Sequence, residues 1–383
     1  KALRKKLMRF IRSLSVMRGG KIILCICIHF FNAVVSSSKR LICMPLTFDF
    51  TNSGNAVTIY KDAQVFPRSS LILLPDKAIL DAVHCSNLRD DNYAAPPVVV
   101  HGLDFAVVGK RDRTVDGPKC AYSLLGNGDF NYFHWMIEIL PRLQELPAAL
   151  DMAPDLHLLV SNRVRDIKQF HDGLEALTPA EVPIFYVPES AGVNVQYLIK
   201  PHPSSLVVFN KREGRPLKEH SSHIEAVSVR WLRSQFIDEK DSPVAGSRRI
   251  FLERGGNGRR YNEDEIFKLF KPHGFEAVRM ESYSLADQVK IASEAEAMAG
   301  PTGAAWTNII FSPPTMKAFY WRAEEYGGIA LYESLAKVTG IESFTRFEFP
   351  VGVASTGELY RHDHHVPPLD LYTAFSSQLQ MLG

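Results

Sequence analysis

The sequence of 383 residues lacks several features that would assign it to a simple class. It has only five cysteines, with no Cys-x-x-Cys pair and no paired histidine spacing, so neither a zinc site nor a disulfide framework is indicated. It has no Walker sequence and no Gly-x-Ser-x-Gly elbow, and no cysteine has an obviously activating setting, so nucleophilic catalysis is poorly supported. A reducing compartment fits this use of cysteine best.

Acidic residues are absent from the first 48 positions, which contain ten Lys or Arg residues ahead of Asp49. The other 34 basic and 42 acidic residues give the rest of the chain a net charge of −8. A globally basic nucleic-acid-binding protein is therefore not expected, and attraction to polyanions is confined to the N-terminal segment.

A long hydrophobic run is also lacking. The apolar run Ile22–Val35 has 14 residues, fewer than the roughly 20 that span a bilayer, and no convincing cleavage site follows it. We therefore expect no signal peptide, and interpret the run as a buried strand or an interfacial extension.

The first 18 positions carry apolar residues at helical spacing and end at Gly19-Gly20. The apolar stripe consists of Leu3, Leu7, Phe10, Ile11, Leu14 and Met17. With its basic residues outside the stripe, this helix would lie in the headgroup region of an anionic membrane, which makes residues 1–40 a predicted membrane-surface segment. The alternative is an ordinary helix that packs the stripe on the core and solvates its basic face.

The composition, 46% hydrophobic and 22% charged, predicts a large packed core, and the length predicts two domains. We expect a first α/β domain over 41–225, a second over 226–360 and a C-terminal tail over 361–383. Short β-like runs broken by turn residues open the first domain, and alternating strands and helices follow, which favours a parallel sheet. The expected strands are 57–60, 70–74, 98–100, 105–108, 121–125, 156–160 and 184–187, and the expected helices are 131–146, bent or ended near Pro141, 164–177 and 219–236.

The second domain has the pattern of a βαβαβ nucleotide-binding half. Asn262 with Glu265 forms a predicted capping box, and Ser284 with Asp287 caps the next helix. The expected strands are 249–253, 275–280, 297–299 and 318–321, and the expected helices run to about 271 and to 294.

Two strand ends in this half carry residues suited to binding phosphate. The turn Pro301-Thr302-Gly303 lies between a strand and a helix starting near Ala304, where backbone N–H groups and the positive helix end attract anions. Arg254, Arg259 and Arg260 follow another strand, where a guanidinium can bind two phosphate oxygens and hold a departing diphosphate. Simple turn geometry and a solvated basic loop are the alternatives.

His134 and Glu138 are four residues apart on the expected helix, so they project from one face. A carboxylate beside an imidazole raises its basicity and fixes its tautomer, which makes His134 a candidate proton acceptor. A structural histidine on an apolar helix is the alternative, although Asp129, Asn131, Trp135 and Arg142 crowd polar and aromatic groups onto the same segment. Consecutive residues cannot all face one ion, so the histidine-rich segment 362–365 is interpreted as a surface loop.

The chain resembles the family 61 glycosyltransferases through short motifs that follow one another between Gly126 and Trp321. The motifs are the helix NYFHWMIEILPRL, the arginine-bearing strand exit with Asn262 and Glu263, the Ser-Leu-x-x-Gln helix with Ser284, Leu285 and Gln288, and the glycine turn with Gly300, Gly303, Ala304 and Asn308. The turn departs from the family pattern at Thr302, commonly His, and at Trp306, usually small or aliphatic.

The resemblance implies an α/β fold of two Rossmann-like domains that face each other across a cleft, the GT-B arrangement. It also implies an inverting glycosyltransferase that moves a sugar from a nucleotide-diphosphate sugar, UDP-linked in our expectation, to a hydroxyl of a glycan or lipid-linked saccharide, without an essential metal or other cofactor. His134 and Glu138 would be catalytic, and Arg254, Arg259, Arg260 and the Thr302-Gly303-Ala304 turn would bind the donor diphosphate.

With a basic amphipathic N-terminus, the enzyme would act in bacterial polysaccharide synthesis, on the inner face of the cytoplasmic membrane; eukaryotic relatives act in the secretory lumen. Two other hypotheses stay open: a non-catalytic nucleotide-sugar or glycan-binding module of the same fold, and a membrane-recruited scaffold that acts through residues 1–40.

Overall fold

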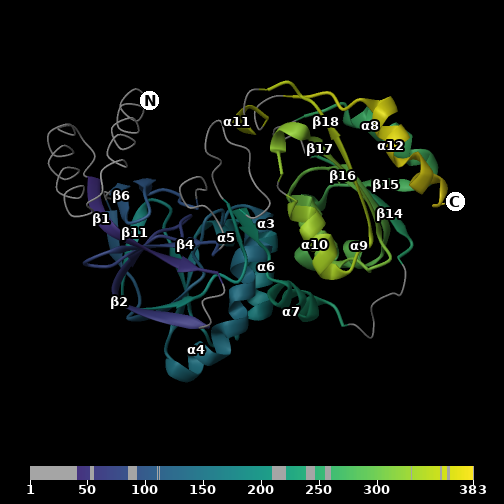
Figure 1. Ribbon diagram of the computed structural model, residues 1–383. Helices are drawn as coiled ribbons and strands as arrows, with labels where there is room; N and C mark the ends of the chain where they lie inside the picture. Colours follow the sequence, from purple (N-terminus) through teal and green to yellow (C-terminus); the bar gives the residue numbers. More distant parts are fainter. Residues whose placement is uncertain are drawn as a thin grey trace.

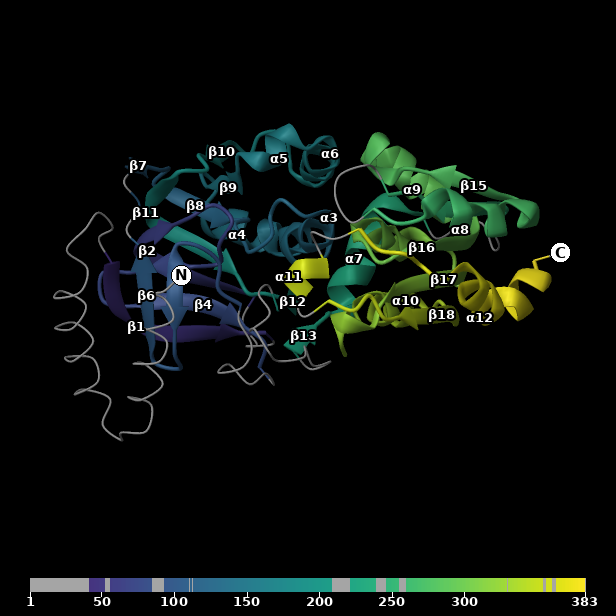
Figure 2. The same cartoon turned by 90° about the horizontal axis from the view of Figure 1, so that it is seen from above.

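The computed structural model describes the chain from residue 41 to residue 382 with several gaps (Figure 1). The described ranges are 41–51, 56–84, 93–109, 111, 113–208, 221–238, 246–254, 260–328, 330–353, 356–359 and 363–382. The predicted amphipathic helix and the run Ile22–Val35 lie outside them. Two sheets stand on either side of a central group of helices (Figure 2).

The first half of the chain builds a mixed sheet of eleven strands in the order β10-β9-β8-β11-β2-β3-β4-β1-β6-β5, with β7 paired to β11. The strands are β1 (Leu41–Phe50), β2 (Val57–Val65), β3 (Ile72–Leu73), β4 (Ala78–Ala82), β5 (Val98–His101), β6 (Phe105–Gly109), β7 (Arg113–Asp116), β8 (Cys120–Ser123), β9 (His157–Ser161), β10 (Ile184–Val187) and β11 (Ala191–Pro201).

Parallel pairing in this sheet joins β10, β9, β8 and β11, whereas β2, β3 and β4 pair antiparallel in sequence. The connections between β2, β3 and β4 are too short for the crossover that a parallel pair requires. The parallel sheet predicted for the first half is therefore correct for the β10-β9-β8-β11 portion and wrong for the sheet as a whole.

The second half forms the predicted parallel sheet, in the order β15-β14-β16-β17-β18. Its strands are β14 (Arg248–Leu252), β15 (Phe275–Val278), β16 (Ala295–Pro301), β17 (Lys317–Ala323) and β18 (Ser343–Phe349), and its helices are α8 (Glu263–Phe270), α9 (Leu285–Ser293), a 3-10 helix (Ala304–Phe311), α10 (Leu331–Thr339), α11 (Thr356–Leu359) and α12 (Pro368–Gln380). The strand order reverses between β14 and β16, and a sheet of this kind binds ligands outside the carboxyl ends of the strands at such a point.

The central helices come mostly from the first half of the chain (Figures 1 and 2). They are α3 (Tyr132–His134), a π-helix (Trp135–Ile139), a 3-10 helix (Leu140–Glu145), α4 (Leu146–Met152), α5 (Arg163–Asp166), α6 (Lys168–Leu177) and α7 (Ala226–Phe236); β12 (Leu206–Val207) and β13 (Ser222–His223) form a small hairpin beside them. One hydrophobic core contains buried residues of both sheets and of these helices, including Trp135 and Trp306. The two halves therefore share their largest core.

Several predicted boundaries are corrected by the structure. The helix expected over 164–177 is divided into α5 and α6, and α7 begins at Ala226 instead of 219. The expected tail contains α12, whose buried Phe375 packs against Phe319 and Trp321 of β17. Among the helices within the described ranges, none combines the length and apolar character needed to cross a bilayer.

The two predicted helix caps have different outcomes. Ser284 caps α9, because its hydroxyl accepts a hydrogen bond from the Asp287 amide at 3.2 Å. The capping box of α8 is confirmed in part: Asn262 stands at the N-cap and its carboxamide N–H donates to Oε2 of Glu265 at 2.7 Å, but its carboxamide oxygen accepts from the amide of Val366 at 2.8 Å and not from a helix amide. The contact with Val366, 104 residues away, therefore fixes the C-terminal segment to the start of α8.

Candidate functional site

The predicted pair His134 and Glu138 is in direct contact at the start of the central helices. Nδ1 of His134 bonds to Oε2 of Glu138, and Oε1 of Glu138 accepts from the backbone amide of Val207. The Glu138 side chain is 4% exposed and the His134 side chain 15%. Because Nδ1 is bonded to Glu138, an acid–base role of the imidazole would fall to the other ring nitrogen, Nε2.

A π-helical turn carries this pair, and Arg142 secures it. The π-helix Trp135–Ile139 is of the kind often found at functional sites. The guanidinium of the buried Arg142 donates to the carbonyl oxygens of Glu138 at 2.8 Å and Leu125 at 3.0 Å. Arg142 thereby links the main chain at Glu138 to the main chain at Leu125, just after β8.

Gly128 packs directly against the imidazole ring. It has a φ of +73°, and a Cβ at this position would lie 2.7 Å from Cδ2 and Cγ of His134. We expect Gly128→Ala to displace the ring from Glu138 and to lower the free energy of unfolding by about 1–3 kcal/mol, measured by denaturant unfolding together with transfer activity.

Gly352 provides the matched control. Its φ is +78°, but a Cβ there would meet nothing within 4 Å. Gly352→Ala therefore reports the backbone cost alone, and equal losses in the two variants would contradict a steric role for Gly128.

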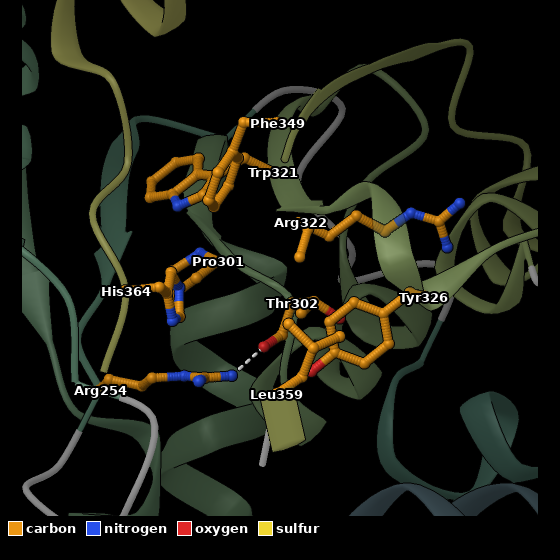
Figure 3. A pocket seen from close by; sticks show the side chains of 10 residues that line it. Arg254, Pro301, Thr302, Trp321, Arg322, Tyr326, Phe349, Leu359 and His364 are labelled. Atoms are coloured by element: carbon orange, nitrogen blue, oxygen red, sulfur yellow. Dashed lines mark hydrogen bonds between the residues drawn. The ribbon is translucent and has the colours of Figure 1, made fainter. Parts of the chain in front are cut away.

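The predicted donor residues Arg254 and Thr302 meet at the carboxyl ends of β14 and β16, where the strand order reverses. The Arg254 guanidinium donates to the carbonyl oxygen of Thr302, as Figure 3 shows. A Cβ on Gly303 would lie 3.4 Å from Nη2 of Arg254, so the guanidinium lies close against the glycine turn.

Two residues of the second half hold this arrangement in place. Oε1 of Glu263 accepts from the amide of Arg254 at 2.6 Å and from the hydroxyl of Tyr261 at 3.1 Å. Burial raises the pKa of Glu263, and the hydrogen bond from the Arg254 amide opposes that rise. Trp306 is fully buried and donates its indole N–H to the carbonyl of Pro301 at 3.0 Å, so the residue that departs from the family pattern braces the turn.

Two cavities share Arg254 and Pro301. The smaller one, drawn in Figure 3, is enclosed by the ends of β17 and β18 together with Thr302, Tyr326 and His364. Residues 363–365 form the expected surface loop, with Asp363 and His365 exposed, whereas the His364 ring lines this cavity and stacks on Tyr261 with ring centroids 6.1 Å apart.

The larger cavity, about 320 Å³, lies between the two halves. Its lining from the second half includes Arg254, Gly303 and Ala304, and its lining from the first half includes Phe130 and Tyr132. Such a cavity is large enough for part of a small-molecule ligand.

A buried hydrogen-bond chain ties the first half to the family motifs of the second. The Tyr132 hydroxyl donates to Oδ1 of Asn308 at 2.8 Å, and Nδ2 of Asn308 donates to Oε1 of Gln288 at 3.0 Å. The Gln288 amide in turn donates to the carbonyl of Met280 at 2.8 Å. The sequence did not predict this role of Tyr132. Its only indication was that Tyr132 lies two residues before the candidate residue His134.

The remaining predicted site residues are separated. Arg260 is exposed and pairs with Asp363 at 3.3 Å, and Arg259 lies outside the described residues. Neither His134 nor Glu138 is among the residues that line the two cavities above. Within the described ranges, no three His, Cys, Asp or Glu side chains are grouped to hold a metal ion.

Asp129 is fully buried in the turn before α3. Burial raises its pKa to about 7, the charge of Glu189 adds to the rise, and the Arg68 amide and charge and the Ser161 hydroxyl oppose it. The folded protein therefore retains a proton between about pH 4 and pH 7 that the unfolded chain loses, so this group's contribution to stability falls as the pH rises through that window.

We expect the effect of Asp129→Asn on the free energy of unfolding to become more favourable by about 2 kcal/mol between pH 5 and pH 8, because only the parent loses the stability of the retained proton over that range. Denaturant unfolding at the two pH values measures the difference. Asp151→Asn, on the exposed end of α4, is the matched control for the change from carboxylate to carboxamide. A gain at Asp129 that is the same at both pH values would disprove the raised pKa.

The sequence profile of the family described as Glycosyltransferase 61 matches residues 132–318. Over these residues, just under half of the chain, the sequence is similar to glycosyltransferase family 61, and this match supports that family for the chain. The match runs from α3 to β17 and contains His134, Glu138, Arg254 and the glycine turn.

The other comparisons add little to the match with family 61. No curated protein matches the chain. Among solved structures, the chain is similar to the metal-soaked Flv1 flavodiiron core from Synechocystis sp. PCC6803, with 11% identity, 63% of this chain and 78% of that chain covered, and a TM-score of 0.23. A likeness at this score carries no argument about this chain.

Proposed function

We propose that this family 61 glycosyltransferase moves a sugar from a nucleotide-diphosphate sugar, UDP-linked in our proposal, to a hydroxyl of a glycan or lipid-linked saccharide, with inversion at the anomeric carbon. The observation that carries the proposal is the contact of Arg254 with the Thr302-Gly303 turn at the reversal of strand order, on the wall of the cavity between the halves. In a GT-B arrangement, the second half would hold the donor and the first half the acceptor.

The donor side of the mechanism rests on charge. The Arg254 guanidinium, with the N–H groups of the Gly303-Ala304 turn, would bind the diphosphate and stabilise the negative charge that develops as it leaves. Arg259 and Arg260 are proposed as further diphosphate ligands. No metal is required in this scheme, because the guanidinium supplies the positive charge.

The acceptor side rests on His134. As the acceptor oxygen forms its bond to the anomeric carbon, the bond from that carbon to the diphosphate oxygen breaks, and the nucleoside diphosphate leaves with the electron pair. Nε2 of His134 takes the acceptor proton, and Glu138 stabilises the resulting imidazolium through Nδ1. This step requires the acceptor hydroxyl to reach the His134 imidazole from the cavity that Tyr132 lines.

The test is an assay of the purified protein against a panel of nucleotide-diphosphate sugars, with and without a chelator. We expect one donor to raise the unfolding temperature and to be turned over, and proton NMR of the product to show the inverted anomer. Donor binding without hydrolysis or transfer would favour the non-catalytic binding module, and loss of turnover with chelator, restored by manganese, would disprove the metal-free scheme.

We also propose that the protein acts in bacterial polysaccharide synthesis as a peripheral protein on the inner face of the cytoplasmic membrane, held there by residues 1–40. Each well-placed cation should contribute about 1 kcal/mol to binding an anionic surface, and salt should weaken it. Deleting residues 1–18 should abolish flotation with anionic vesicles but spare transfer to a short soluble acceptor. A full-length protein that stays in solution with such vesicles at low salt would rule out this membrane attachment.

A further inference from the structure

A group of aromatic and charged side chains lies at the carboxyl ends of the parallel strands β8, β9 and β10. It consists of Arg68, Asp129, Phe130, Ser161 and Glu189, which we call the Phe130 cluster. Because α/β sheets bind ligands beyond the carboxyl ends of parallel strands, this edge is the first half's counterpart of the Arg254 edge in the second half.

Buried groups hold the exposed members of the cluster in place. The Asp129 carboxylate, itself 0% exposed, accepts a hydrogen bond from the Arg68 amide at 2.8 Å, and Arg68 has a φ of +58°, which is unusual for a residue with a side chain. The Ser161 hydroxyl, also buried, donates to Glu189 at 3.1 Å.

These restraints place a guanidinium over an aromatic ring. The Arg68 guanidinium lies 4.2 Å from the centroid of Phe130 and 3.9 Å from the Glu189 carboxylate. All three side chains are more than a third exposed, and the least exposed of them is Phe130 at 36%. The guanidinium covers one face of the Phe130 ring, and the exposed surface carries one charge of each sign next to that ring.

The cluster is continuous with the cavity between the halves, since Phe130 lines that cavity together with Arg254 and Gly303. A pyranose ring has an apolar C–H face that packs on an aromatic ring and hydroxyl groups that bind carboxylates and guanidinium groups. The opposite charges of Arg68 and Glu189 favour a neutral sugar over an acidic one.

We propose that the Phe130 cluster is the acceptor subsite, where a neutral saccharide ring packs on Phe130 and binds Arg68 and Glu189 through its hydroxyl groups. Asp129 is a positioning residue that fixes Arg68 and does not touch the sugar. The proposal rests on the proposed transfer function, and it places the acceptor at the first-half wall of the cavity that contains Arg254.

The experiment is saturation-transfer difference NMR of the full chain with a panel of methyl glycosides of neutral hexoses and pentoses, with methyl glucuronide as the acidic comparison. We expect a neutral glycoside to bind the parent, and Phe130→Ala to weaken that binding about tenfold or more. Arg68→Gln and Glu189→Gln, which leave the ring in place, should each weaken it by a smaller factor.

Tyr197→Ala is the matched control, because Tyr197 lies on β11 in the same half and is likewise 36% exposed. The subsite would be overturned if Phe130→Ala bound the glycoside as the parent does, or lost no more binding than Tyr197→Ala. It would also be overturned if the parent preferred the glucuronide or bound no glycoside.

Measurements of donor binding distinguish failure of the acceptor subsite from failure of the proposed transfer function. The unfolding temperature with nucleotide-diphosphate sugars should rise in the parent and in Arg68→Gln alike. If the parent shows no such rise and no turnover, the transfer function fails, whereas normal donor turnover in a parent that binds no glycoside on Phe130 refutes only the acceptor subsite.

Discussion

Replacing His134 by alanine is expected to lower the rate of sugar transfer by about 10²- to 10⁴-fold, the usual contribution of a general base, while leaving nucleotide-sugar binding nearly unchanged. The reason is that the imidazole acts on the acceptor hydroxyl and is not among the residues that surround Arg254 in the two cavities. Transfer assays at saturating donor, together with thermal shifts by the donor, measure the two quantities separately.

The control for this variant is stability, since His134 also contacts the buried Glu138. Denaturant unfolding of His134→Ala shows whether a lost activity reflects a lost fold. Turnover within about tenfold of the parent would place the base elsewhere, with Glu138 as the next group to test.

Arg254→Ala is expected to weaken binding of the nucleoside diphosphate by about ten- to a hundredfold, and binding of the free nucleoside much less. Charge-assisted hydrogen bonds to the diphosphate are lost, whereas the nucleoside offers the guanidinium no comparable charge. Titration calorimetry with both ligands measures the ratio.

Arg346 offers a matched arginine on the same sheet, because it pairs with Glu333 at 2.7 Å and does not line either cavity. Arg346→Ala should leave both affinities unchanged. Equal diphosphate affinity in Arg254→Ala and the parent would remove Arg254 from the donor site, and the same titration of Arg260→Ala tests the second predicted arginine.

The contacts that the sequence predicted correctly are those set by short-range spacing. The four-residue interval of His134 and Glu138 brings the two side chains into contact, as helical geometry requires. The positions of Arg254 and Thr302 after two parallel strands bring them to one sheet edge, which follows from the βαβ pattern alone.

Pairings between distant segments could not be predicted in this way. Short β-like runs have the same alternation in parallel and antiparallel pairs, so the mixed first sheet was not apparent from its strands. Asn262 lies in a helix-capping sequence, yet its carboxamide oxygen accepts from the amide of the distant Val366. Likewise, no local sequence pattern predicts the hydrogen bond from Tyr132 to Asn308.

The core shared by both sheets has a consequence for how the molecule unfolds. Trp135 stacks on Phe170 in the first half, and Leu285 of the second half belongs to the same buried group. A chain cut near residue 226 would leave each fragment with an uncovered apolar face, because this largest core takes buried residues from both halves. The two halves should therefore lose their structure in one cooperative transition, and relative movement between them is limited to what the central helices allow without opening this core.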